Sequence, residues 1–67
     1  MTAQEYSNMI YERHYKGYYI VEKDVFTARE LAKESAILNA EEMLLLSKEE
    51  PSLAYFYSNV LTHLKTI

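Results

Sequence analysis

The sequence predicts a small all-α domain. Its 67 residues contain one glycine and one proline, which leaves little room for the tight turns of a multi-stranded sheet. Hydrophobic residues make up 49% of the chain and charged residues 25%, a balance typical of a folded protein. We expect a single helical domain over residues 1–67, in which two helices form an antiparallel hairpin with an N-terminal helix and a short extended segment packed across it.

The first helix of the hairpin is expected over residues 27–48. Thr27 and Glu30 have the spacing of a capping box, in which the Thr hydroxyl accepts from the backbone N–H three residues on and the Glu reaches back. On a wheel of about 100° per residue, one broad face gathers side chains that we assign to the core. They are Leu31, Leu38, Leu45, Ala28, Ser35, Leu46, Ala32, Met43 and Ala36.

The opposite side of this helix carries a second, smaller apolar group. Ile37 and Leu44 lie seven residues apart, with Ala40 beside them, close to a stripe of glutamates. A helix with large apolar residues on two faces is typical of a bundle centre or a dimer seam. The three residues are therefore a candidate protein interface, and a homodimer is expected.

The second helix of the hairpin is expected to begin at Pro51, whose missing N–H has no partner in a first helical turn anyway. Apolar residues then recur at helical spacing to the end of the chain. They are Leu53, Phe56, Tyr57, Val60, Leu61, Leu64 and Ile67. The connection over residues 47–50 is short, which makes the two helices antiparallel neighbours.

An N-terminal helix is expected over residues 3–15. Thr2 and Glu5 form a second possible capping box, and Gly17 stands where a helix C-terminal glycine would. Residues 18–21 are then expected to be extended, with residues 22–24 as a polar connection. A β-hairpin is the alternative for this region, with strands before and after a Lys-Gly turn, because aromatic and β-branched residues crowd it.

Residues 26–35, Phe-Thr-Ala-Arg-Glu-Leu-Ala-Lys-Glu-Ser, resemble the first helix of helix-turn-helix DNA-binding domains. The resemblance implies a transcriptional regulator with a turn and a recognition helix over residues 39–44. The family usually has a Gly in the turn, where this chain has Ser-Ala-Ile, and the would-be recognition helix carries two carboxylates that would repel phosphates. One uninterrupted helix explains the same residues, so a degenerate helix-turn-helix is kept as the alternative.

Tyrosine and basic residues concentrate between positions 11 and 19. The candidate interface residues here are Tyr11, Arg13, Tyr15, Tyr18 and Tyr19. Such a mixture can stack bases along a positive groove, it can bury its rings against neighbouring helices, or it can form a protein interface, where Tyr and Arg are enriched. Because the net charge is −3, we favour a protein partner over nucleic acid.

The sequence offers no pattern for catalysis, and we expect no enzyme, metal or cofactor. The two histidines, His14 and His63, have no metal-binding spacing, and Ser58 is not placed beside His63 by a five-residue separation. No apolar run reaches the roughly 20 residues of a membrane span, so a cytoplasmic protein is expected. We therefore expect a self-associating protein-interaction module, of the size of small prokaryotic or phage regulators and adaptors.

Overall fold

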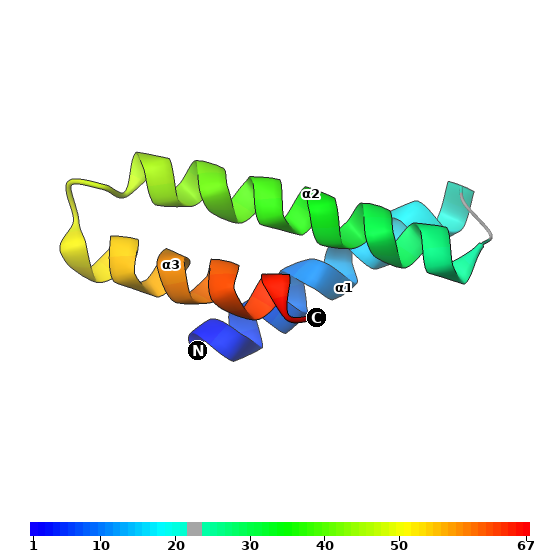
Figure 1. The fold of residues 1–67 in the computed structure, drawn as a ribbon, viewed down its shortest axis with the longest axis horizontal. Helices are drawn as coiled ribbons and strands as arrows, with labels where there is room; N and C mark the ends of the chain where they lie inside the picture. Colours follow the sequence, from blue (N-terminus) through cyan, green and yellow to red (C-terminus); the bar gives the residue numbers. More distant parts are fainter. Residues whose placement is uncertain (22–23) are drawn as a thin grey trace.

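The computed structural model describes residues 1–21 and 24–67, and these residues form three helices. They are α1 (Ala3–Val21), α2 (Val25–Leu46) and α3 (Pro51–Lys65). The all-α prediction is confirmed, and the described residues contain no strand. Each helix packs on both others in an elongated bundle of 40 × 19 × 16 Å, in which α3 runs below the C-terminal half of α2, and α1 starts below α3 and passes behind the N-terminal half of α2 (Figure 1).

The helix α1 is longer than the sequence predicted. Its start is confirmed, because the Thr2 N–H donates to Glu5 Oε1 at 2.9 Å and the Glu5 N–H donates to Thr2 Oγ1 at 3.1 Å. Its end is not, because residues 16–21 continue the helix through Gly17 in place of a turn and an extended segment. Gly17 is an exposed helical residue with open space around its Cα, so a helix former would be about 1 kcal/mol better there, a cost that packing overrides.

The N-cap of α2 lies three residues before the predicted cap. Asp24 is the N-cap, and its carboxylate accepts from the Phe26 N–H at 3.1 Å and from the Thr27 hydroxyl at 2.9 Å. Thr27 is therefore inside the helix and supports the cap through its side chain. Of the expected connection, residues 22 and 23 lie outside the described residues. The helix then runs without a break to Leu46, so no turn follows the segment that resembles a helix-turn-helix.

The inward face of α2 is made of alanines. They lie four residues apart and are fully buried: Ala28, Ala32, Ala36 and Ala40. Leu38 and Leu45 were assigned to the core from the wheel, yet each leaves 66% of its surface exposed, and Leu46 leaves 73%. That assignment is wrong for these leucines because α1 and α3 approach α2 along the alanine stripe, where short side chains allow the backbones to come close.

The core lies where α1, α2 and α3 meet. Ile10 of α1 joins Val60 and Leu64 of α3, and Ala36 and Ala40 of α2 complete the cluster. Next to it, the Tyr6 ring of α1 packs edge-on against the Phe56 ring at 5.6 Å and the Tyr57 ring at 5.9 Å. These contacts fix α1 across α3 and leave the far side of α2 without a covering helix.

A buried serine lets α1 and α3 come close together. The hydroxyl of Ser7 lies 2.7 Å from the carbonyl oxygen of Ala3 and 3.2 Å from that of Val60, and the residue is fully buried. Its one hydroxyl hydrogen serves the nearer acceptor on its own helix, in the manner of serines within helices. The small side chain thus meets α3 without leaving an unpaired polar group.

Candidate functional site

Three tyrosines form a ladder along α1. The rings of Tyr11 and Tyr15 are stacked with centroids 6.3 Å apart, and those of Tyr15 and Tyr19 are stacked at 5.8 Å. The four-residue spacing brings them to one side of the helix. The sequence singled out all three, and the structure places them together.

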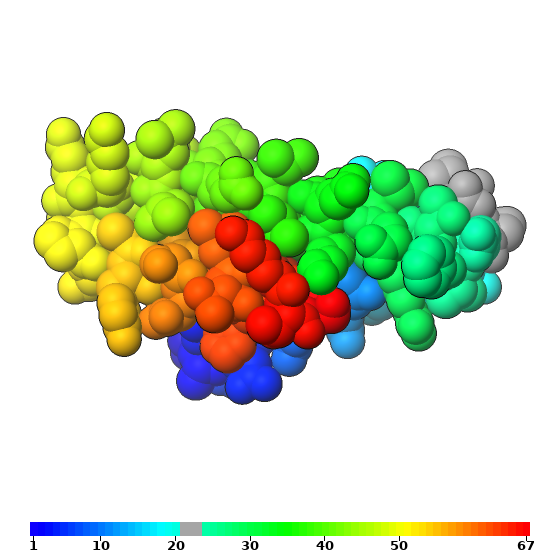
Figure 2. Space-filling model, in the orientation of Figure 1, coloured from blue at the N-terminus to red at the C-terminus, as the bar shows by residue number. Residues whose placement is uncertain are grey.

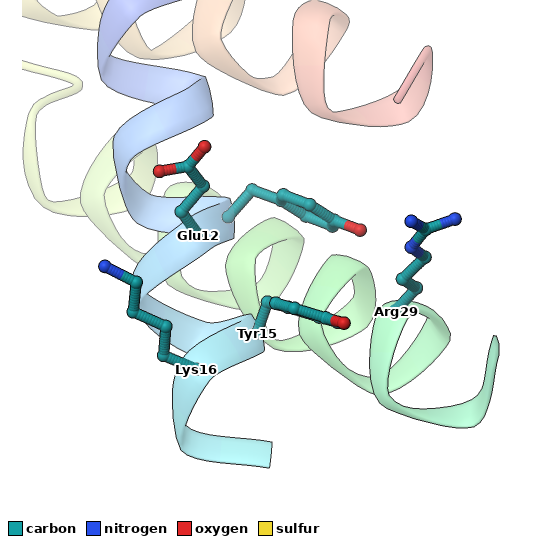
Figure 3. A pocket seen from close by; sticks show the side chains of 5 residues that line it. Glu12, Tyr15, Lys16 and Arg29 are labelled. Carbon is teal, nitrogen blue, oxygen red and sulfur yellow. The ribbon is translucent and has the colours of Figure 1, made fainter. Parts of the chain in front are cut away.

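The ladder forms one wall of a shallow groove between α1 and the first turns of α2. The groove has a volume of about 360 Å³, and its lining residues are Tyr11, Glu12, Tyr15, Lys16 and Arg29. In Figure 3 the Tyr15 hydroxyl and the Arg29 guanidinium point toward the same space from the two helices. We call this the tyrosine groove. Arg29 was not among the residues predicted for this site. It joins them only through the packing of α1 on α2, which brings together residues that are far apart in the sequence.

A second depression, of about 460 Å³, continues from the tyrosine groove and shares Tyr11 and Arg29 with it. Its other lining residues are Phe26, Glu30, Lys33 and Ile67. The Lys33 Nζ atom donates to the main-chain oxygen of Ile67 at 3.2 Å, which ties the end of the chain to α2. Both basic residues of α2 therefore face this side of the helix.

The other predicted residues of α1 lie on a different flank. Arg13 and Tyr18 line a third depression, of about 300 Å³, together with His14 and Gly17. The Tyr18 hydroxyl also lies 2.6 Å from Ser35 Oγ of α2, so this tyrosine tethers two helices. The structure thus divides the predicted tyrosine and arginine cluster between two sides of α1.

The predicted dimer seam faces the inside of the single chain. Ala40 is fully buried, Ile37 packs against the core, and Leu44 is half-buried. Their part in a dimer stays a prediction, and it would require the three residues to be partly uncovered from the bundle. The core face expected from the wheel was right for Ala28, Ala32 and Ala36, which are buried, and wrong for its exposed leucines.

Part of the exposed apolar surface of α2 is a row of leucines that were expected in the core. Leu31, Leu38 and Leu45 lie seven residues apart, and we call them the outer leucine row. Leu31 is half-buried, whereas Leu38 and Leu45 are each two-thirds exposed. In Figure 2 the side chains of α2 form the upper outline of the molecule, and α3 covers only its lower side. The alanines at four-residue spacing were the signal that could have shown which face turns inward.

The described part of the chain contains no group of three or more metal-ligating side chains. Among the same residues, no helix is long and apolar enough to cross a membrane. Ser58 is exposed and His63 half-buried on α3. No family model, curated protein or solved structure matches the chain. The case for function therefore depends on the geometry of these surfaces.

Proposed function

We propose that this protein is an interaction module that acts by docking on another protein through the outer face of α2. The outer leucine row is the observation that carries the proposal. Scattered apolar residues are normal on protein surfaces, whereas a contiguous apolar patch marks an interaction site. Leu38 and Leu45 share one face of one helix and are both two-thirds exposed, so a partner that spans two turns of α2 would cover both.

The fold does not require Leu38 and Leu45 to be exposed. The chain has large side chains available in α2, yet the residues that it buries fully there are four alanines, while Leu38, Leu45 and Leu46 are largely exposed. Burying a leucine contributes about 1.5–3 kcal/mol, which a chain of this size could use. A partner that covers the row would gain that energy on binding, in the helix-in-groove manner of many adaptors.

The tyrosine groove supports the same function class as a second surface. Tyr and Arg supply much of the binding energy at protein interfaces, and here stacked tyrosines face Arg29 across an open groove. The groove and the outer leucine row lie on different sides of α2. A module with two such surfaces could bring two proteins together, as expected of an adaptor.

Site-specific photo-crosslinking tests the proposal. A photoreactive amino acid is placed at Leu38 in the full chain and, as a matched control, at the exposed Thr62 of α3, in cells that naturally produce the protein. We expect a discrete adduct with another protein from position 38 and none from position 62, and loss of that adduct when Leu45 is changed to Ser.

Other results of the crosslinking experiment would point to other binding modes. Equal labelling from both positions, or no adduct from position 38, would contradict docking through α2. An adduct of twice the chain mass would assign the face to self-association, and light scattering at several loading concentrations would then give the size of the oligomer. Binding of the predicted dimer type through Ile37 and Leu44 would leave position 38 unlabelled.

A further inference from the structure

Carboxylates flank the outer leucine row on both sides. At about 100° per residue, Glu34 and Glu41 fall beside the row on one side, and Glu42 falls beside it on the other. All three are exposed. The basic residues of α2, Arg29 and Lys33, lie on the far side of the helix, where they line the second depression. The rim of the row over these turns is therefore negatively charged.

This rim makes a second copy of the chain a poor occupant. In a two-helix seam, the residues three or four positions beyond each leucine of the row also face the partner helix. Three positions beyond Leu31 and Leu38 are Glu34 and Glu41. Four positions beyond them are Ser35 and Glu42. In the antiparallel arrangement that stacks Leu38 on its own copy, Glu34 would meet Glu42 of the other chain. Like charges at such positions oppose pairing.

The same rim disfavours a membrane surface. Helices that lie on bilayers carry Lys and Arg on the polar face, next to the apolar residues that enter the lipid. The cytoplasmic leaflet is negatively charged and attracts such basic segments. Glu34, Glu41 and Glu42 would instead repel anionic headgroups while the leucines approached them.

We infer that the outer leucine row binds an amphipathic helix of a partner protein whose apolar stripe is flanked by lysines or arginines. The inference rests on the proposed function and adds the chemistry of the partner. From Leu31 to Leu45 the row is about 21 Å long at 1.5 Å per residue, the length of a partner helix of about four turns. Opposite charge at the rim would set the orientation, exclude wrong partners and speed association.

Three synthetic helical peptides test the inference on the full chain. They share one leucine stripe of about four turns and differ only in flanking residues, which are Lys, Gln or Glu. Fluorescence anisotropy should show the Lys-flanked peptide binding at least about tenfold more tightly than the Gln-flanked one, with no detectable binding of the Glu-flanked one. Binding should weaken as salt rises from ~50 mM to ~500 mM.

Variants of the chain give the matched controls. The triple variant E34K/E41K/E42K should prefer the Glu-flanked peptide, a reversal that a merely structural role could not produce. Glu41→Lys alone should weaken binding of the Lys-flanked peptide, whereas the double variant S58K/T62K, which alters net charge equally on exposed positions of α3, should leave it unchanged. Helicity by circular dichroism confirms folding of each variant.

Each contrary result has its own meaning. Equal binding of all three peptides would overturn the charge inference, while docking through the row would stand. If no peptide binds but position 38 still crosslinks to a partner, the inference fails and the proposed function survives. Self-association that strengthens with salt would assign the row to a second copy, and binding to anionic vesicles would assign it to a membrane. Either would overturn both proposals.

Discussion

The helices α2 and α3 use their large apolar side chains in opposite ways. In α3, Val60 and Leu64 are fully buried and form the core with α1. In α2, the alanines face the core, and Leu38 and Leu45 remain two-thirds exposed. The difference teaches that α3 buries large apolar side chains in the core, whereas α2 packs there through small ones and leaves large ones such as Leu38 and Leu45 exposed.

Truncating one leucine in each helix tests this contrast most strongly. Leu64→Ala should lower the free energy of unfolding by about 2–5 kcal/mol, because it opens a cavity in the core. Leu38→Ala should change it by less than about 0.5 kcal/mol, as expected of a surface site. Urea denaturation followed by circular dichroism measures both. A comparable loss from the two variants would mean that Leu38 is covered in solution, and the contrast would fail.

Enlarging a residue on α2 tests the close approach along the alanine stripe. Ala36→Leu should destabilise the fold by about 1–3 kcal/mol, since the added atoms must push α1 or α3 away. The control is Asn39→Leu on the same helix, which is exposed and should shift stability by about 0.5 kcal/mol or less. If Ala36→Leu and Asn39→Leu change the stability equally, close packing along the alanines does not hold the helices together.

The helices α2 and α3 also differ in how their N-termini are capped. The α2 helix has a side-chain cap at Asp24, whereas Glu50 before α3 makes no side-chain cap hydrogen bond. Asp24→Ala should therefore cost about 0.5–2 kcal/mol, and Glu50→Ala should be close to neutral. Thermal unfolding of both variants measures the difference. Thr27→Val should cost less than Asp24→Ala; the reverse order would restore Thr27 as the cap.

The sequence was sufficient for the features that local chemistry decides. The capping box at Thr2 and Glu5 and the start of α3 at Pro51 were predicted correctly, because each depends on residues within one helical turn. The all-α class followed in the same way. Local signals also misled, however: Gly17 suggested a helix end, and Thr27 suggested a helix start.

Features that depend on packing could not be read from the sequence. Both faces of α2 are apolar, so the wheel had no means to decide which one α1 and α3 would cover. Tertiary contacts also carry α1 past Gly17, since Tyr18 reaches Ser35 of α2. The pairing of Arg29 with the tyrosine ladder has the same origin. The residues predicted for α1 were thus brought together only in part, and the interface predicted on α2 stays a prediction.

The aromatic residues of α3 divide between its two sides, and this division predicts a pH effect. Tyr6 of α1 lies against Phe56 and Tyr57 on the inner side, whereas Tyr55 is exposed on the outer side. Burial raises the pKa of the Tyr6 hydroxyl above its ordinary value, Tyr57 raises it further, and Arg13 acts weakly in the opposite direction.

The sign of the effect follows from which state ionises first. The unfolded chain loses the Tyr6 proton near pH ~10, while the folded chain holds it to higher pH. The stabilisation is therefore complete below that value and is lost as pH rises through the folded pKa. Tyr6→Phe keeps the ring contacts and removes the ionisable group, so its stability should decline less on the alkaline side than that of the wild type.

Tyr55→Phe is the matched control, because it removes a hydroxyl of the same kind from an exposed position. Its stability should decline with pH as steeply as that of the wild type. Urea denaturation from pH ~8 to pH ~11 gives the slopes for all three chains. If Tyr6→Phe and Tyr55→Phe decline alike, the inner aromatic cluster is open to solvent, and the two sides of α3 would no longer differ.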